Sequence, residues 1–406
     1  MFNENWVALT LFALLIGLLF HQSSLLLLSL LILTAAAAGW VWNKYSLHRV
    51  SFQRSFSEHR LFLGETVELT VQATNAKWLP VSWLRIDDEY PLAITLLEGA
   101  TQPSNKPDIA VMSSVMSLRW FDRARWLYRL RCDKRGVYAF GPARLQSGDL
   151  FGLFSSEQVP SKQDWVVVYP PVRPIHGLVL PPKEPFGETR ADQWLFEDPS
   201  RAAGIRDYAP GDGLKRVHWK ASARQQRLQS KVYEPTTTFQ VVLFLNMATL
   251  PRPWHGSVPE LLERGISVAA SIASEVVAMR YQVGVFANGC WPQSDQPLKV
   301  QPSRSPDQLT RVLEALAAVS AVPTISIEAL LNKESPQLPW GATLVVVTAV
   351  VTEDLLAVMA RLHTFGRKLV LVCLTDAALP FSLPGVLVER VQETGGSFCL
   401  RVEPQA

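Results

Sequence analysis

The chain has 406 residues, of which 48% are hydrophobic and 18% charged, and it carries a formal net charge of +3. Such an apolar composition excludes a disordered chain, and the weak basic bias argues against a nucleic-acid-binding protein. A chain of this length exceeds the usual size of one domain, so we expect several folding units. The cysteines are far apart and lack metal-binding spacing, so we expect free thiols, mostly buried. They are Cys132, Cys290, Cys373 and Cys399.

Residues 1–47 predict a transmembrane helical hairpin. From Trp6 to Phe20 every residue except Thr10 is apolar or glycine, and residues 25–42 are equally apolar except for one serine and one threonine. The second segment approaches the length that a bilayer core of about 30 Å requires, whereas the first is short. Because residues 21–24 leave room for a tight loop alone, the segments are expected to run antiparallel.

The charges that flank the hairpin predict its orientation. The basic side chains that follow the second segment are Lys44, His48, Arg49, Arg54 and Arg60. By the positive-inside rule, the rest of the chain lies in the cytoplasm, which predicts a multi-pass protein of a bacterial inner membrane. A cleaved signal peptide is the alternative, but the first five residues contain Glu4 and no Lys or Arg.

Residues 50–160 predict an antiparallel, β-sandwich-like domain. Apolar and polar residues alternate with period two at residues 67–72, 81–86, 125–131 and 165–169, and Gly and Pro separate these runs. No catalytic triad, metal cluster or phosphate loop is evident in this region. A structural or interaction module is the favoured interpretation.

Residues 161–235 are expected to connect two domains and contain the densest motif, from Gly204 to Glu234. Pro210-Gly211 fits a type II turn, and Asp212 stands where a helix N-cap belongs. A helix that starts there would place Arg216, Lys220 and Arg224 on one face. These cations require internal acids, an acidic partner or phospholipid headgroups nearby, and the sequence leaves the three open.

The aromatic and nucleophilic residues of this motif allow two interpretations. Trp219 and Ala223 would lie on the neighbouring face, where core packing is expected. A hydrolase that uses Asp212, His218 and Ser222 is conceivable, but a Ser and a His on one helical turn lack an orienting acid and oxyanion donors. We therefore expect no catalytic residue here.

Residues 236–406 predict an α/β domain. Expected strands occupy residues 239–245, 283–287, 343–350 and 368–374, and expected helices occupy residues 259–281, 306–318 and 352–365. Continuous apolar strands flanked by helices indicate a parallel sheet that is covered on both faces. Ligands of such folds bind beyond the carboxyl ends of the strands, and the first of these ends starts at Asn246.

With the motif and this architecture together, the chain resembles the MoxR-associated family known as domain of unknown function 58. The matching residues of the motif are Arg206, Tyr208, Pro210, Gly211, Asp212, Arg216, His218, Trp219, Ser222, Ala223, Arg224, Leu228, Tyr233 and Glu234. Upstream, residues 135–138, 148–153 and 168–170 also match. Together with Lys220, the motif is a candidate interaction site.

The resemblance implies a von Willebrand A-like, Rossmann-type C-terminal domain that frequently partners a MoxR-type AAA+ ATPase. Such domains usually hold Mg²⁺ through a DxSxS strand end, which supplies hard oxygen ligands. Here the three places hold Asn246, Ala248 and Leu250, and Thr249 is out of phase. We therefore expect a degenerate metal site and no cofactor, although Thr348, Glu353 and Asp354 near a later strand end are possible contributors.

The sequence thus favours a multidomain, non-enzymatic adaptor or scaffold. It would be tethered to membrane lipid by the hairpin and would act with an AAA+ ATPase in the assembly or maturation of protein complexes. The alternatives are a hydrolase and an envelope structural protein of the opposite topology.

Overall fold

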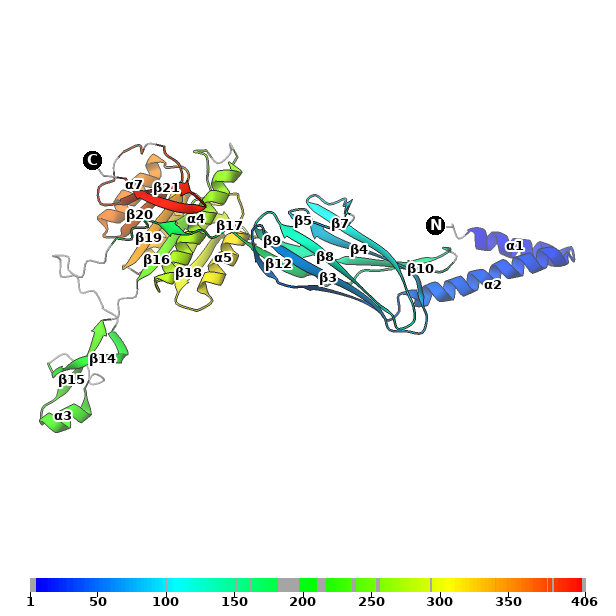
Figure 1. The fold of residues 1–406 in the computed structure, drawn as a ribbon, viewed down its shortest axis with the longest axis horizontal. Coiled ribbons are helices and arrows are strands. Elements are labelled where there is room, and N and C mark those ends of the chain that lie inside the picture. The colour runs from blue at the N-terminus through cyan, green and yellow to red at the C-terminus, as the bar shows by residue number, and fades with distance from the viewer. Residues whose placement is uncertain are drawn as a thin grey trace. The chain divides into compact units, whose positions relative to one another are not determined.

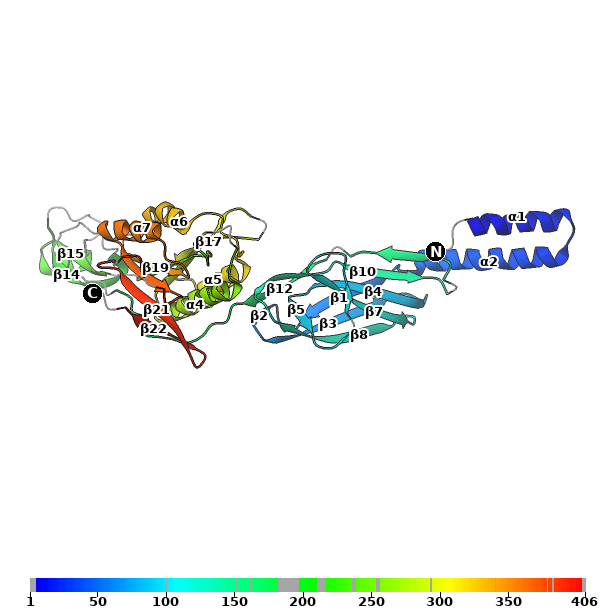
Figure 2. The same cartoon turned by 90° about the horizontal axis from the view of Figure 1, so that it is seen from above.

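The computed structural model describes residues 5–99, 101–150, 152–160, 162–181, 197–209, 217–235, 239–252, 256–292, 294–339, 341–377, 379–381 and 383–403. Contacts divide the chain into two compact units (Figures 1 and 2). Unit 1 comprises Met1–Pro171 with Leu316–Ala318, and unit 2 comprises Val172–Ala315 with Val319–Ala406.

Unit 1 begins with two apolar helices, α1 (Asn5–Leu19) and α2 (Ser23–Ser46), which lie side by side (Figure 2). Among the described residues, α2 is the one helix that is long and apolar enough to cross a membrane. The apolar part of α1, Leu9–Leu19, is shorter. The expected apolar N-terminal segment is therefore confirmed as helical.

The rest of unit 1 is almost entirely β-structure in three sheets, as the period-two pattern predicts. The strands are β1 (Val50–Phe56), β2 (Arg60–Phe62), β3 (Thr66–Asn75), β4 (Val81–Pro91), β5 (Ile94–Leu96), β6 (Thr101–Pro103), β7 (Ile109–Leu118), β8 (Arg123–Cys132), β9 (Gly136–Phe140), β10 (Ala143–Gly148), β11 (Ser155–Gln158) and β12 (Asp164–Tyr169). The sheets have the orders β1-β3-β8-β5, β11-β10-β4-β7-β6 and β2-β12-β9, and all pairs except β2–β12 are antiparallel. Strand β12 lies within the segment that was expected to connect the domains.

A buried ion pair crosses the interior of the β-structure. The guanidinium of Arg54 donates to the carboxylate of Asp88, at 2.5 and 2.9 Å, and to the carbonyl of Phe140 at 2.8 Å. It also donates to Asp164 at 3.1 Å. Arg54 therefore joins β1, β4, β9 and β12, so this cation points into the protein rather than toward a membrane surface.

Hydrogen bonds and a close approach at a glycine hold the C-terminal half of α2 against the β-structure. Lys77 Nζ donates to the carbonyl of Ser46 at 2.6 Å, and the Ser46 and Ser156 hydroxyls are 3.1 Å apart. Nearer the N-terminus of α2, a Cβ added at Gly39 would lie 3.0 Å from a carboxylate oxygen of Asp149, so the absence of a side chain favours this close approach. The helix is therefore packed along the β10–β11 hairpin by its small residues.

Unit 2 is built on one eight-stranded mixed sheet. Its strands are β13 (Ile175–His176), β16 (Gln240–Leu245), β17 (Gln282–Cys290), β18 (Pro297–Ser303), β19 (Ala342–Thr348), β20 (Lys368–Cys373), β21 (Leu387–Thr394) and β22 (Ser397–Val402). Its helices are α4 (Pro259–Ala278), α5 (Gln308–Ala318), α6 (Ile327–Glu334), η3 (Ser335–Gln337) and α7 (Glu353–Thr364).

The strand order is β13-β22-β21-β20-β19-β16-β17-β18, and β17, β16, β19, β20 and β21 run parallel. Counted from β16, the order is that of a doubly wound fold, 3-2-1-4-5-6, with the third strand antiparallel. The order reverses between β16 and β19, where such folds open a crevice at the carboxyl ends of the strands. The expected α/β architecture is confirmed, and β18, α6, β21 and β22 were not foreseen.

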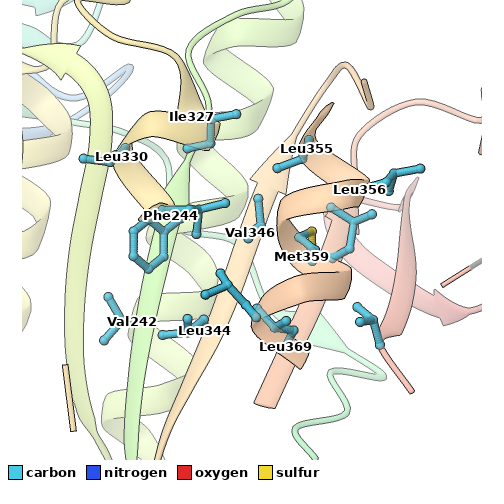
Figure 3. Close-up of a cluster of buried hydrophobic side chains, with 14 of the residues drawn as sticks. Val242, Phe244, Ile327, Leu330, Leu344, Val346, Leu355, Leu356, Met359 and Leu369 are labelled. Atoms are coloured by element: carbon cyan, nitrogen blue, oxygen red, sulfur yellow. The ribbon is translucent and has the colours of Figure 1, made fainter. Parts of the chain in front are cut away.

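Alternate residues of the parallel strands pack against helices on both faces. Figure 3 shows one face, where side chains of β16, β19 and β20 meet α6 and α7. Its labelled residues are Val242, Phe244, Ile327, Leu330, Leu344, Val346, Leu355, Leu356, Met359 and Leu369. On the other face, Gly265 of α4 lies over Leu245 and Leu374. Two-sided burial explains why these strands read as continuous apolar runs.

A further segment of unit 2 forms a separate antiparallel pair, β14 (Glu197–Asp207) and β15 (Gln229–Pro235), with the short helix α3 (Trp219–Gln225) between them. This segment carries the motif that the sequence singles out.

A buried carboxyl group on β21 makes unit 2 pH-sensitive. Glu389 is fully buried, and burial raises its pKa from 4.5 to about 7 although one oxygen accepts a hydrogen bond from the amide of Val179. The folded state therefore retains the proton that the unfolded state loses. The stabilising contribution of the protonated Glu389 is complete below pH 4.5 and is lost as the pH rises to about 7. The free energy of unfolding falls by up to about 3 kcal/mol over this range.

We expect Glu389→Gln to remove this fall in stability, measured by urea denaturation of the full chain at pH 5 and pH 8. Glu260→Gln, an exposed position of unit 2 in none of the ion pairs formed among the described residues, is the matched control and should leave the pH dependence unchanged. Equal pH dependence in Glu389→Gln and the wild type would contradict the assignment.

Candidate functional site

The motif forms a β-hairpin whose strands pair in register. Arg206 on β14 pairs with Ser230 on β15, and Ala202 pairs with Tyr233. Past the end of β14, the amide of Tyr208 donates to the carbonyl of Leu228 at 2.9 Å. Pro210, Gly211, Asp212 and Arg216 lie outside the described residues.

The helix of the motif begins later than the sequence suggests. Val217 forms a β-bridge with Ser230, and the Nδ1 atom of His218 accepts a hydrogen bond from the amide of Ala221 at 3.1 Å. His218 is therefore the N-cap of α3, and the bridge at Val217 separates this helix from Asp212, the expected helix start, which lies outside the described residues. The expected common face with Arg216 involves a residue outside the described part of the chain, whereas Lys220 and Arg224 both lie on α3.

Lys220 and Arg224 remain one turn apart on α3, and both are exposed. None of the ion pairs formed among the described residues involves either cation. Trp219 is 66% exposed and Ala223 is also exposed, so the expected core packing of this face is wrong. A seven-residue helix without any buried residue cannot cover an indole.

His218 and Ser222 hold the local structure together and do not form a nucleophile–base pair. The Ser222 hydroxyl donates to the carbonyl of His218 at 3.1 Å and accepts from the amide of Gln229 at 2.9 Å. Because the Nδ1 of His218 caps the helix, it is not available as a base toward that hydroxyl. Asp207 accepts a hydrogen bond from the side chain of Gln229, which again links the two strands.

A neutral hydrogen-bond network joins the carboxyl ends of three strands of the large sheet. Asn246, at the end of β16, donates through Nδ2 to the Thr348 hydroxyl at 3.0 Å. Its Oδ1 accepts from Asn288 Nδ2 at 3.0 Å and from the amide of Ala248 at 3.1 Å. Asn288 in turn accepts from the amide of Met247 at 2.7 Å. The ends of β16, β17 and β19 are thus joined through side chains that are almost completely buried.

The remaining positions of this strand end do not add charged ligands. Thr249 accepts from the amide of Val258, the residue that precedes α4, at 2.7 Å. Ala248 and Leu250 carry no oxygen in their side chains. Glu353 and Asp354 are exposed in the first turn of α7, where acids stabilise a helix N-terminus. Within the described part of the chain, no group of three or more His, Cys, Asp and Glu residues is placed to hold a metal ion.

Sequence reasoning found Asn246 and Thr348 but missed Asn288, which lies near the end of β17 and completes the network. The sequence feature that could have indicated Asn288 is its position directly after the apolar run 283–287. The four cysteines are free, as expected, and burial raises the pKa of Cys132 and Cys373 to about 11, so these two thiols are poorly reactive.

The cap at His218 can be tested by hydrogen exchange. His218→Ala removes the acceptor for the amide of Ala221, which should destabilise α3 by about 1 kcal/mol and speed exchange at that amide about fivefold. His218→Asn, which also caps helices, should retain protection. Equal exchange in both variants and the wild type would show that the ring does not cap the helix.

Comparison with known proteins identifies the family. Residues 204–401 match the family described as Protein of unknown function DUF58. The Bacillus subtilis (strain 168) protein described as "Uncharacterized protein YeaD" is 26% identical over 354 residues, which are 86% of this chain and 82% of that protein.

Some solved structures resemble part of the chain. A type II cohesin domain from the cellulosome of Acetivibrio cellulolyticus matches 29% of this chain and 94% of its own, with 11% identity and a TM-score of 0.21. A cohesin module of a Clostridium perfringens glycoside hydrolase matches 29% and 96%, with 14% identity and a TM-score of 0.20. These scores carry no conclusion. The motif, the match over residues 204–401 and the Bacillus relative together show that this part of the chain belongs to the DUF58 family.

Proposed function

We propose that this protein is a membrane-anchored adaptor or scaffold without enzymatic activity. Its unit 2, which contains the α/β domain and the β14–α3–β15 segment, docks a protein partner, a MoxR-type AAA+ ATPase, in the assembly or maturation of other protein complexes. The observation that carries this proposal is the closed network of Asn246, Asn288 and Thr348 at the carboxyl ends of the strands.

The network supports a recognition role because of its chemistry. The donors and acceptors that face the crevice are neutral and already bonded to each other. Hard divalent cations prefer carboxylate and hydroxyl oxygens, and the three positions of a DxSxS strand end hold Asn246, Ala248 and Leu250. The strand order of unit 2 supports a von Willebrand A-like domain with a degenerate metal site.

The anchor is α2, paired with α1 as a hairpin in the bacterial inner membrane. Trp40, Trp42 and Tyr45 supply interfacial aromatic rings, and the ammonium of Lys44 lies over the ring of Trp40 at 5.2 Å. The cations after α2 favour a cytoplasmic position for the two units.

The exposed side chains of α3 form the proposed contact with the ATPase. Trp219, Lys220 and Arg224 combine an aromatic ring with two cations, and Leu228 nearby is 49% exposed. Trp and Arg are the residues that most often dominate binding energy at protein interfaces, and exposed cations suit an acidic surface. The atoms of His218 and Ser222 already hold the hairpin together, so no observation favours the hydrolase alternative.

Co-purification tests the partner. We expect the full-length protein, extracted in mild detergent, to recover a MoxR-type ATPase that mass spectrometry identifies. Lys220→Glu combined with Arg224→Glu should lower recovery at least tenfold, because two charge pairs become repulsive. Arg129→Glu combined with Lys162→Glu, two exposed cations on unit 1, is the matched control. Recovery that is equal in both double variants would exclude the α3 surface, and no ATPase in the wild-type sample would refute the proposal.

Metal titration tests the degenerate site. Calorimetric titration of the full-length wild type with Mn²⁺ should show no saturable uptake, whereas Asn246→Asp/Ala248→Ser/Leu250→Ser should gain it, because the variant restores one carboxylate and two hydroxyls. Tight uptake by the wild type that Asn246→Ala abolishes would overturn the proposal.

A further inference from the structure

A cavity of about 670 Å³ lies beside the C-terminal end of α2, within unit 1. One part of its lining is apolar and consists of Ala37, Ala38 and Val41 on α2. The basic side chains of His48, Arg49 and Lys77 also line the cavity, together with Trp42, Tyr45 and Leu79. Ala37 precedes the last helical residue by nine positions, or about 14 Å along the axis. The lining therefore changes from apolar to basic along the axis of a helix that we propose to span a membrane.

The basic side chains of the cavity form no ion pair with another described residue. None of the ion pairs formed among the described residues involves His48, Arg49 or Lys77. Lys77 is 9% exposed, and its burial lowers its pKa to about 8. Its ammonium donates to the carbonyl of Ser46 at 2.6 Å, a neutral acceptor at the end of the helix. A buried cation without an anion is costly unless a ligand supplies the negative charge.

A second polar group of the lining has no partner. The Nε1–H of Trp42 is buried and donates no hydrogen bond. Trp42 lines the same cavity. Buried indole N–H groups usually find an acceptor, so the cavity offers a donor as well as positive charge.

The loops beside the cavity expose aromatic side chains. Trp78 is 78% exposed and follows Lys77 directly, and its ring contacts that of Phe121 at 5.1 Å. Trp120 is also largely exposed. The buried amide of Asn75 donates to the carbonyls of Leu79 and Arg119, which holds the β3–β4 and β7–β8 loops together. Exposed Trp and Phe next to cations are typical of a surface that enters the interfacial region of a bilayer.

We propose that this cavity binds one anionic phospholipid of the membrane that holds α2. The headgroup phosphate lies among His48, Arg49 and Lys77, and the glycerol and upper acyl chains lie along Ala37, Ala38 and Val41. The rings of Trp78, Trp120 and Phe121 rest in the same leaflet. This inference rests on the proposed anchoring of α2 in a membrane.

Native mass spectrometry of the full-length protein, released from neutral detergent after removal of bound lipid, tests the site. Phosphatidylglycerol and phosphatidylcholine are added in equal amounts, and inorganic phosphate is added in a separate sample. We expect one phosphatidylglycerol per chain, with at least tenfold preference over phosphatidylcholine. Each basic residue near a membrane contributes about fivefold to lipid affinity, so Arg49→Gln combined with Lys77→Gln should weaken binding about 25-fold.

Two further variants separate the site from general effects. Arg129→Gln combined with Lys162→Gln removes the same charge outside the cavity and should leave binding unchanged. Ala38→Phe fills the apolar part of the cavity without altering charge and should abolish binding, with circular dichroism confirming that the variant is folded. Equal binding of the two lipids, equally tight binding of inorganic phosphate alone, or unchanged binding in the Arg49/Lys77 and Ala38 variants would overturn the proposal.

Membrane fractionation distinguishes this proposal from the anchoring on which it rests. A full-length chain that alkaline carbonate releases from membranes would refute the anchoring before any lipid is tested. A chain that requires detergent for release but shows no preference for phosphatidylglycerol would refute the lipid site and leave the anchor in place.

Discussion

The buried side-chain amide of Asn246 is the interaction on which the carboxyl edge of the large sheet depends. An amide is both donor and acceptor, so it bonds Asn288, Thr348 and the amide of Ala248 simultaneously. A carboxylate at the same place could accept but not donate to the Thr348 hydroxyl, and burial would disfavour its charge. Leaving one of these buried groups unbonded costs about 1–3 kcal/mol, which keeps the strand ends in a single arrangement.

Hydrogen-bond partners also distinguish two buried cations within unit 1. In unit 1, Arg54 is buried but fully compensated by Asp88, Asp164 and a backbone carbonyl. Lys77 is buried with a single neutral acceptor. Arg54 therefore stabilises the core of unit 1, whereas Lys77 is the cation for which we propose an anionic ligand. This difference is the basis for treating Arg54 as a structural cation and for proposing Lys77 as a binding cation.

Much of the fold follows from sequence periodicity. Strands β3, β4, β8 and β12 and the parallel strands of unit 2 lie where alternation or continuous apolar runs predict them. Helix α6 and strands β18, β21 and β22 were missed because they are short or carry polar residues, and their formation depends on packing against the sheet. Tertiary context of this kind is absent from a local pattern.

The candidate sites could be predicted from the sequence less completely than the fold. Asn246 and Thr348 could be found because they follow apolar strands, but their contact with Asn288 depends on the strand order. The basic face of the motif was misplaced because helical spacing alone cannot show that Val217 bridges to Ser230. The cavity joins α2 to Lys77, whose position next to Ser46 no spacing rule predicts.

The contact between Gly39 and Asp149 has a mechanical consequence. The absence of a side chain at Gly39 lets the β10–β11 hairpin approach the helix. Lys77 and Ser156 form hydrogen bonds with Ser46 at the end of the helix. These contacts oppose rotation or translation of α2 relative to the β-structure. On the proposal that α2 spans a membrane, a tilt of the helix in the bilayer would therefore change the orientation of the β-structure relative to the membrane surface.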